Sequence, residues 1–81
     1  MRIDVLFFAA AREKAGTERM SIDLADGATV AHLWSRLAHD FPSLAPILTS
    51  SRAAVDEQFA PMSAALRDGS TVAVLPPVSG G

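Results

Sequence analysis

The chain of 81 residues is 49% hydrophobic and 20% charged, with a formal net charge of -2, and this composition predicts one small folded domain over residues 1–81. Its lack of cysteine excludes disulfides, thiolate metal ligands and a cysteine nucleophile. The acidic balance gives no basic footprint for nucleic acid, and no apolar run is long enough to cross a bilayer, so we expect a cytoplasmic protein with no nucleic-acid or membrane partner.

Two strands and a short helix are predicted first. The apolar residues of RIDVLFFAA alternate with a period of two and occupy both faces toward its end, which is typical of a central strand. Gly16 stops the helical turns that follow, and an Asp-Gly pair ends the second strand in a turn. The predicted elements are a strand over residues 2–10, a helix over 9–15 and a strand over 18–27.

The strongest helical pattern of the chain follows Thr29, a plausible N-cap. Pro42 ends this helix, because proline disfavours the helical conformation of the residue before it. Trp34 lies beside the apolar stripe and widens it. The stripe has helical spacing and consists of Val30, Leu33, Leu37 and Phe41.

Two further strands are predicted after an irregular or short helical connection. The first, over residues 52–60, places Val55, Glu57 and Phe59 on one face. The last, over residues 70–75, has apolar residues on both faces and suits a central position.

The order of strands and helix is therefore β-β-α-β-β, which predicts an α+β fold. A small mixed sheet with one main helix packed across one face buries the helix stripe. The first and last strands become neighbours in the middle of the sheet, which is the β-grasp arrangement. Residues 76–81 then leave the sheet as an extended, flexible tail.

The tail VSGG, preceded by two prolines, contains the candidate reactive group. Pro76 and Pro77 favour an extended path and cannot continue a central strand. Gly80 and Gly81 have no side chains, so they fit a channel too narrow for a Cβ atom. Adenylation with ATP would make the terminal carboxylate an acyl donor, which a sulfur nucleophile would convert to a thiocarboxylate. The alternative is a disordered tail without function.

Other candidate sites are weaker. His32, Arg36 and His39 form the polar face of the helix, and two histidines without further ligands do not predict a metal site. Ser79 has no histidine or acid placed by the sequence to activate it. The aromatic residues are predicted to lie in the core or in an interface; these are Phe7, Phe8, Trp34, Phe41 and Phe59.

Two segments, VLFFAAAREKAG near the start and LRDGSTVAVLPPVSGG at the end, resemble the small subunits of molybdopterin synthase. The similarity covers the whole chain, and LPPVSGG is its most specific part. The chain departs from the family at Ser70 and Thr71, where DGDEV is common, and at Asp56, where asparagine is common. Both departures are distant in sequence from the terminal glycines.

The resemblance implies a ubiquitin-like β-grasp fold and a sulfur carrier that is not an enzyme on its own and binds no cofactor. A ubiquitin-activating-type enzyme would adenylate Gly81 with ATP, and a sulfur donor would then give the thiocarboxylate. The tail would enter the large subunit of a 2+2 heterotetramer and donate sulfur to cyclic pyranopterin monophosphate. The resemblance assigns the chemistry to Gly80 and Gly81, and the contacts with the partner channel to Leu75, Pro76, Pro77, Val78 and Ser79.

Three other functions stay open at this point. A sulfur carrier for another pathway, such as thiamin synthesis, shares the fold and the glycine end but typically lacks the two prolines. A ubiquitin-like modifier would use the same carboxylate to form an amide with a lysine. A plain interaction module would not need the terminal glycines at all.

Overall fold

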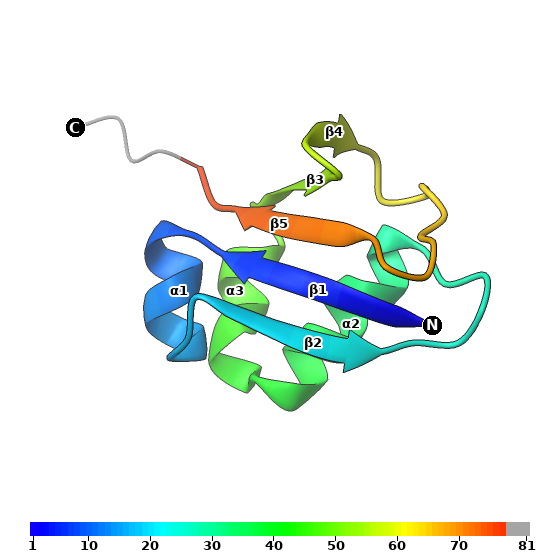
Figure 1. The fold of residues 1–81 in the computed structure, drawn as a ribbon. Coiled ribbons are helices and arrows are strands. Elements are labelled where there is room, and N and C mark those ends of the chain that lie inside the picture. The colour runs from blue at the N-terminus through cyan, green and yellow to red at the C-terminus, as the bar shows by residue number, and fades with distance from the viewer. Residues whose placement is uncertain (78–81) are drawn as a thin grey trace.

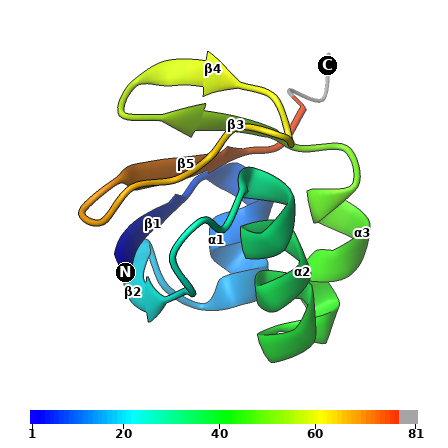
Figure 2. The same ribbon diagram turned by 90° about the vertical axis from the view of Figure 1, so that its right-hand side faces the viewer.

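The computed structural model describes residues 1–77 as one mixed sheet with its helices on one face (Figures 1 and 2). None of the helices in this part of the chain is long and apolar enough to cross a membrane. The elements in chain order are β1 (Arg2–Phe7), α1 (Ala9–Ala15), β2 (Arg19–Asp23), α2 (Val30–Asp40), the 3-10 helix η1 (Pro42–Leu44), α3 (Ala45–Leu48), β3 (Arg52–Val55), β4 (Gln58–Ala60) and β5 (Thr71–Leu75).

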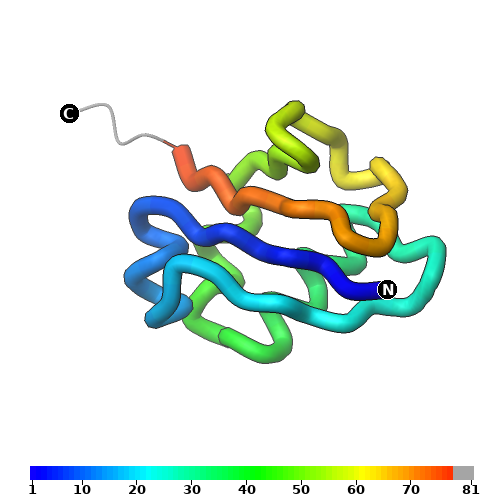
Figure 3. The backbone as a smooth tube through the Cα atoms, viewed as in Figure 1, coloured from blue at the N-terminus to red at the C-terminus, as the bar shows by residue number. Residues whose placement is uncertain are grey.

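The first and last strands lie side by side in the middle of the sheet, as predicted (Figure 3). The strand order is β2-β1-β5-β3-β4, with β1 and β5 parallel and the other neighbours antiparallel. Val5 lies opposite Val72, and both side chains are fully buried. The sheet order and the helices on one face confirm the β-grasp fold.

Helix α2 begins at the predicted cap. The Thr29 side chain accepts a hydrogen bond from the His32 backbone N–H at 3.4 Å, and the Thr29 N–H donates to His32 Nδ1 at 2.9 Å. This reciprocal pair satisfies two backbone donors at the start of the helix. Val30, Leu33 and Leu37 are fully buried, which confirms the predicted stripe within α2. Phe41, its fourth predicted member, is the C-cap after the helix and is half-buried against the same core.

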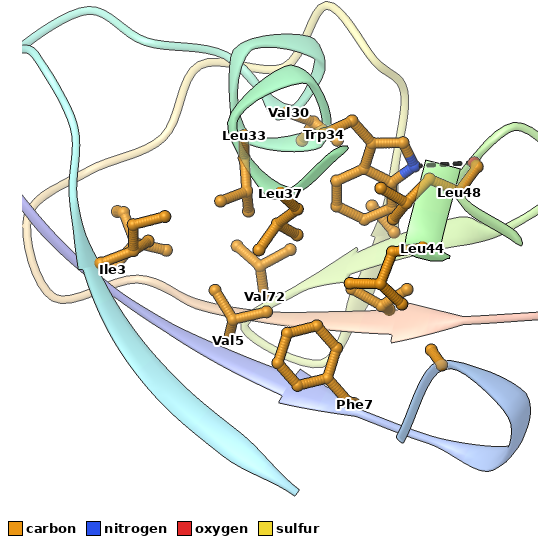
Figure 4. Packing of buried hydrophobic residues seen from close by; sticks show 14 of the residues in the cluster. Ile3, Val5, Phe7, Val30, Leu33, Trp34, Leu37, Leu44, Leu48 and Val72 are labelled. Atoms are coloured by element: carbon orange, nitrogen blue, oxygen red, sulfur yellow. Dashed lines mark hydrogen bonds between the residues drawn. The ribbon is translucent and has the colours of Figure 1, made fainter. Parts of the chain in front are cut away.

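The connection between α2 and β3 contains two short helices that close the core. Leu44 is fully buried and Leu48 is 3% exposed. The Trp34 Nε1–H donates to the Leu48 carbonyl oxygen at 3.0 Å (Figure 4). The indole therefore fills the core without leaving its donor unpaired.

The single strand predicted over residues 52–60 is wrong, because the chain reverses at Asp56 and Glu57. Both residues have positive φ, 48° and 72°, and form a two-residue hairpin turn between β3 and β4. The Asp56 N–H donates to the Thr71 carbonyl oxygen, and Asp56 Oδ1 accepts from the Thr71 N–H. The reversal places Phe59 opposite Ala54, on the other face of the sheet from Val55.

Replacing Glu57 with glycine is expected to stabilise the protein. The left-handed conformation at φ 72° is unfavourable for a residue with a Cβ atom, and Asp-Gly is a preferred pair for such turns. We expect the free energy of unfolding to rise by about 0.5–1 kcal/mol, measured by urea denaturation. Glu57→Ala, which keeps the Cβ atom, is the control and should give no such gain. A destabilised Glu57→Gly variant would contradict this interpretation of the turn.

Candidate functional site

The base of the tail is held by the central strand β5. Val72 and Val74 are fully buried on its core side, and β5 is paired with β1 on one side and β3 on the other. Leu75 and Pro76 are half-buried and Pro77 is exposed. The strand ends at Leu75, because Pro76 has no N–H to extend the ladder.

The rest of the predicted site lies outside the described residues. This applies to Val78, Ser79, Gly80 and Gly81, whose roles stay predictions. The structure places the strand that precedes these residues, β5, in the centre of the sheet.

The face of the sheet opposite the helices carries an apolar row. Cross-strand neighbours place Leu6 beside Ala73, Ala73 beside Ala54, and Ala54 beside Phe59. Phe59 is 62% exposed, and Phe8, which follows β1, is 46% exposed. We name these five residues the open-face patch. An exposed apolar patch that crosses several strands is typical of a protein-binding surface.

A hollow of about 340 Å³ overlaps this patch. The residues that line it are Leu6, Phe8, Ala54, Asp56, Glu57, Thr71 and Ala73. Asp56 and Glu57 border the hollow near the beginning of β5, away from the tail. The hollow is therefore apolar in its middle and acidic at one end.

Sequence reasoning did not find this patch. It explained the two apolar faces of β1 and β5 by a central position, which is correct, but the helices cover only one of these faces (Figure 2). The sequence predicts that the aromatic residues lie in the core or in an interface. Phe7 and Trp34 are buried, whereas Phe8 and Phe59 are exposed on the patch. The patch could be recognised only from the pairing of Ala54 with Phe59, and this pairing depends on the β3–β4 hairpin, which the sequence did not indicate.

The histidines of α2 have positions that fit the predicted solvated face. His32 and His39 are both exposed, and the His32 imidazole accepts a hydrogen bond at the helix cap. Within residues 1–77, no group of three or more histidine, cysteine, aspartate or glutamate side chains is arranged to hold a metal ion.

Comparison with known proteins gives full-length matches. The sequence profile of the ThiS family matches residues 5–81. The molybdopterin synthase sulfur carrier subunit of Chlamydomonas reinhardtii is 36% identical over 83 residues, covering 100% of both chains. The corresponding subunit of Mycobacterium tuberculosis is 34% identical over 82 residues, covering 100% of this chain and 99% of its own.

Solved structures share the fold. SAMP1, a small archaeal modifier protein from Haloferax volcanii, has a TM-score of 0.89 at 25% identity, with 100% of both chains covered. A chain in the complex of subunits 1 and 2 of the molybdopterin-converting factor from Helicobacter pylori has a TM-score of 0.74 at 24% identity, with 100% of both chains covered. The profile match and the full-length relatives show that this chain belongs to the ThiS family, together with the molybdopterin synthase sulfur carrier subunits.

Proposed function

We propose that this chain is the sulfur carrier subunit of molybdopterin synthase and that the carboxylate of Gly81 carries the sulfur. The observation that carries the proposal is the full-length match to such carriers, combined with a Gly-Gly end that follows the central strand. Pro76 and Pro77 give the tail a stiff base, and the terminal glycines leave its acyl carbon uncrowded.

The chemistry at Gly81 takes place in two steps. A carboxylate oxygen attacks the α-phosphate of ATP and releases pyrophosphate, which gives an acyl adenylate. A sulfur nucleophile then attacks the acyl carbon and displaces AMP, which gives the thiocarboxylate. The chain supplies the acyl group, a sulfur donor supplies the sulfur atom, and an adenylating enzyme catalyses the formation of the adenylate.

Sulfur transfer would take place in the large subunit of the synthase. The thiocarboxylate sulfur would attack a carbon of cyclic pyranopterin monophosphate and displace an oxygen substituent from that carbon. Water would then cleave the acyl–sulfur bond, which leaves the sulfur on the pterin and regenerates the Gly81 carboxylate. A dithiolene contains two sulfur atoms, so each product would require two loaded carriers. We place this reaction in the cytoplasm.

The open-face patch would be the contact surface for the large subunit in a 2+2 heterotetramer. It includes Ala73 of β5 and the neighbours of Ala73 on β1 and β3, so a partner that binds it would also receive the tail. In Helicobacter pylori, the related subunit 1 was solved in complex with subunit 2. The residues proposed to line the tail channel of the partner are Leu75, Pro76, Pro77, Val78 and Ser79.

Replacing both Pro76 and Pro77 with glycine is expected to weaken binding to the large subunit. Glycine gives the unbound tail more conformations, which must be lost on entry into the channel. We expect a loss of about 1 kcal/mol in binding free energy for each substitution, measured by isothermal titration calorimetry. Pro61→Gly in the loop after β4 is a matched control and should bind normally. Unchanged affinity of the tail variant would contradict the proposed stiffening.

Intact mass spectrometry tests the function directly. The protein is incubated with ATP, its adenylating enzyme and a sulfide source. A mass increase equal to the replacement of one oxygen by sulfur, located on the C-terminal peptide, is the expected result. No increase under conditions that load a related carrier would overturn the proposal.

A ubiquitin-like modifier is the second candidate, because SAMP1 has the same fold. A modifier would form an amide between Gly81 and a lysine of a target. Lys14 is the only lysine of this chain, so chains of the protein on itself would have at most one lysine for attachment. Covalent adducts with other proteins, in place of the thiocarboxylate, would favour this function.

A further inference from the structure

We propose that Arg52 is a specificity-determining residue that binds a carboxylate of the large subunit beside the entrance of the tail channel. This inference rests on the proposed function, since it assumes that the large subunit receives the tail. It assigns a role to a charged side chain that lies outside the open-face patch and outside the tail.

The register of the sheet places Arg52 at the base of the tail. Arg52 lies directly opposite Leu75, the last residue of β5. Residues directly opposite each other on antiparallel strands project from the same face of the sheet. Arg52 therefore projects from the open face, at the point where the chain leaves the sheet.

The guanidinium of Arg52 is held in place by an aromatic ring. Its central carbon lies 4.0 Å from the centroid of the Phe59 ring. A stacked guanidinium keeps its N–H donors available at its edges and has less conformational freedom to lose on binding. The pair is therefore a preorganised donor for a carboxylate, which arginine binds with two parallel hydrogen bonds.

The charge of Arg52 is not neutralised within residues 1–77. Arg12 pairs with Glu18 and Arg36 pairs with Asp40, but no ion pair in this part of the chain includes Arg52. Arg52 is also exposed. A carboxylate of the partner could therefore form an ion pair with Arg52 without breaking an existing ion pair among these residues.

Charge is distributed unevenly along the open face. Arg19 is the first residue of β2 and Arg52 is the first residue of β3. Both lie at the end of the strands where β5 ends. Asp56 and Glu57 lie at the other end of the strands, in the hairpin turn. A partner with acidic groups around the channel entrance would bind in only one orientation, because reversal would bring like charges together.

The length of the tail indicates that the anion belongs to the partner protein and not to the pterin substrate. Gly81 is the sixth residue after Leu75, and six residues span up to about 20 Å when the chain is extended. A substrate at the acyl carbon of an inserted tail would then be distant from Arg52. The group that Arg52 meets would be on the surface around the entrance.

Calorimetric titration of the large subunit with Arg52 variants of the full chain tests the proposal. We expect Arg52→Ala to weaken binding about tenfold and Arg52→Glu about a hundredfold or more. Arg52→Lys should cause an intermediate loss of affinity, because lysine keeps the positive charge but lacks the planar guanidinium that forms two parallel hydrogen bonds with a carboxylate. Arg52→Ala should also show a shallower decrease of affinity with salt, which a merely structural role would not produce.

Arg67→Glu is the matched control, because it changes the net charge by the same amount at an exposed residue that, like Arg52, has no ion pair within residues 1–77, and it precedes β5, at the end of this strand away from the tail. It should bind nearly as the unmodified chain does. Equal affinity of Arg52→Glu and the unmodified chain, or an equal loss in both Glu variants, would overturn the role of Arg52. Failure of the unmodified chain to bind the large subunit would instead overturn the proposed function.

Discussion

Deletion of Gly81 is expected to abolish sulfur transfer while leaving the fold intact. The shortened chain still ends in a glycine carboxylate, that of Gly80, so the chemical nature of the end is unchanged. Its acyl carbon, however, stops about 3.4 Å short of the original position. A misplacement of about 1 Å can cost a hundredfold in rate, so we expect a loss of at least that size in molybdopterin formation.

The measurement is product formation with the large subunit and cyclic pyranopterin monophosphate, alongside the intact mass of the carrier. The thermal unfolding midpoint should be unchanged, because the core that the structure describes is formed by residues before the tail, the last of them Val74 in β5. Gly81→Ala keeps the full length of the tail but adds a methyl group next to the acyl carbon. Comparing it with the deletion variant distinguishes an effect of tail length from an effect of steric crowding. Full activity of the deletion variant would rule out a carrier role for the Gly81 carboxylate.

The central part of the fold could be predicted from local patterns. The alternation in β1, the stripe of α2 and the glycine after α1 each depend on neighbours in sequence. The cap of α1 shows this well: Gly16 has φ 75°, and its N–H bonds to the Arg12 carbonyl oxygen. Two strands that are apolar on both faces then required a central position, and β1 and β5 have it.

The β3–β4 hairpin could not be predicted in the same way. Its turn consists of Asp56 and Glu57, without the glycine that usually marks such a turn. The conformation is supported by a partner distant in sequence, since Asp56 exchanges two hydrogen bonds with Thr71 of β5. The open-face patch and the stacking of Arg52 on Phe59 both depend on this tertiary contact, so neither was visible in the sequence.

Replacing Leu37 with alanine is expected to destabilise the protein by about 2–5 kcal/mol. Leu37 is fully buried in α2, in the same core as Val5 and Val72 of the central strands (Figure 4). The substitution removes apolar contacts and leaves a cavity that a close-packed core cannot fill completely. In a domain of this size we expect the thermal midpoint to fall by at least about 10 °C.

Leu37→Met is the matched control, because it roughly conserves side-chain volume and should cost less than about 1.5 kcal/mol. Urea denaturation of the two variants measures the difference. A nearly unchanged midpoint in Leu37→Ala would mean that the stripe of α2 does not face the sheet. Val72 packs in the same core as Leu37 and belongs to the strand that holds the tail. Below the melting range Leu37→Ala should therefore still accept sulfur at Gly81, and its activity should fall only as the folded fraction falls.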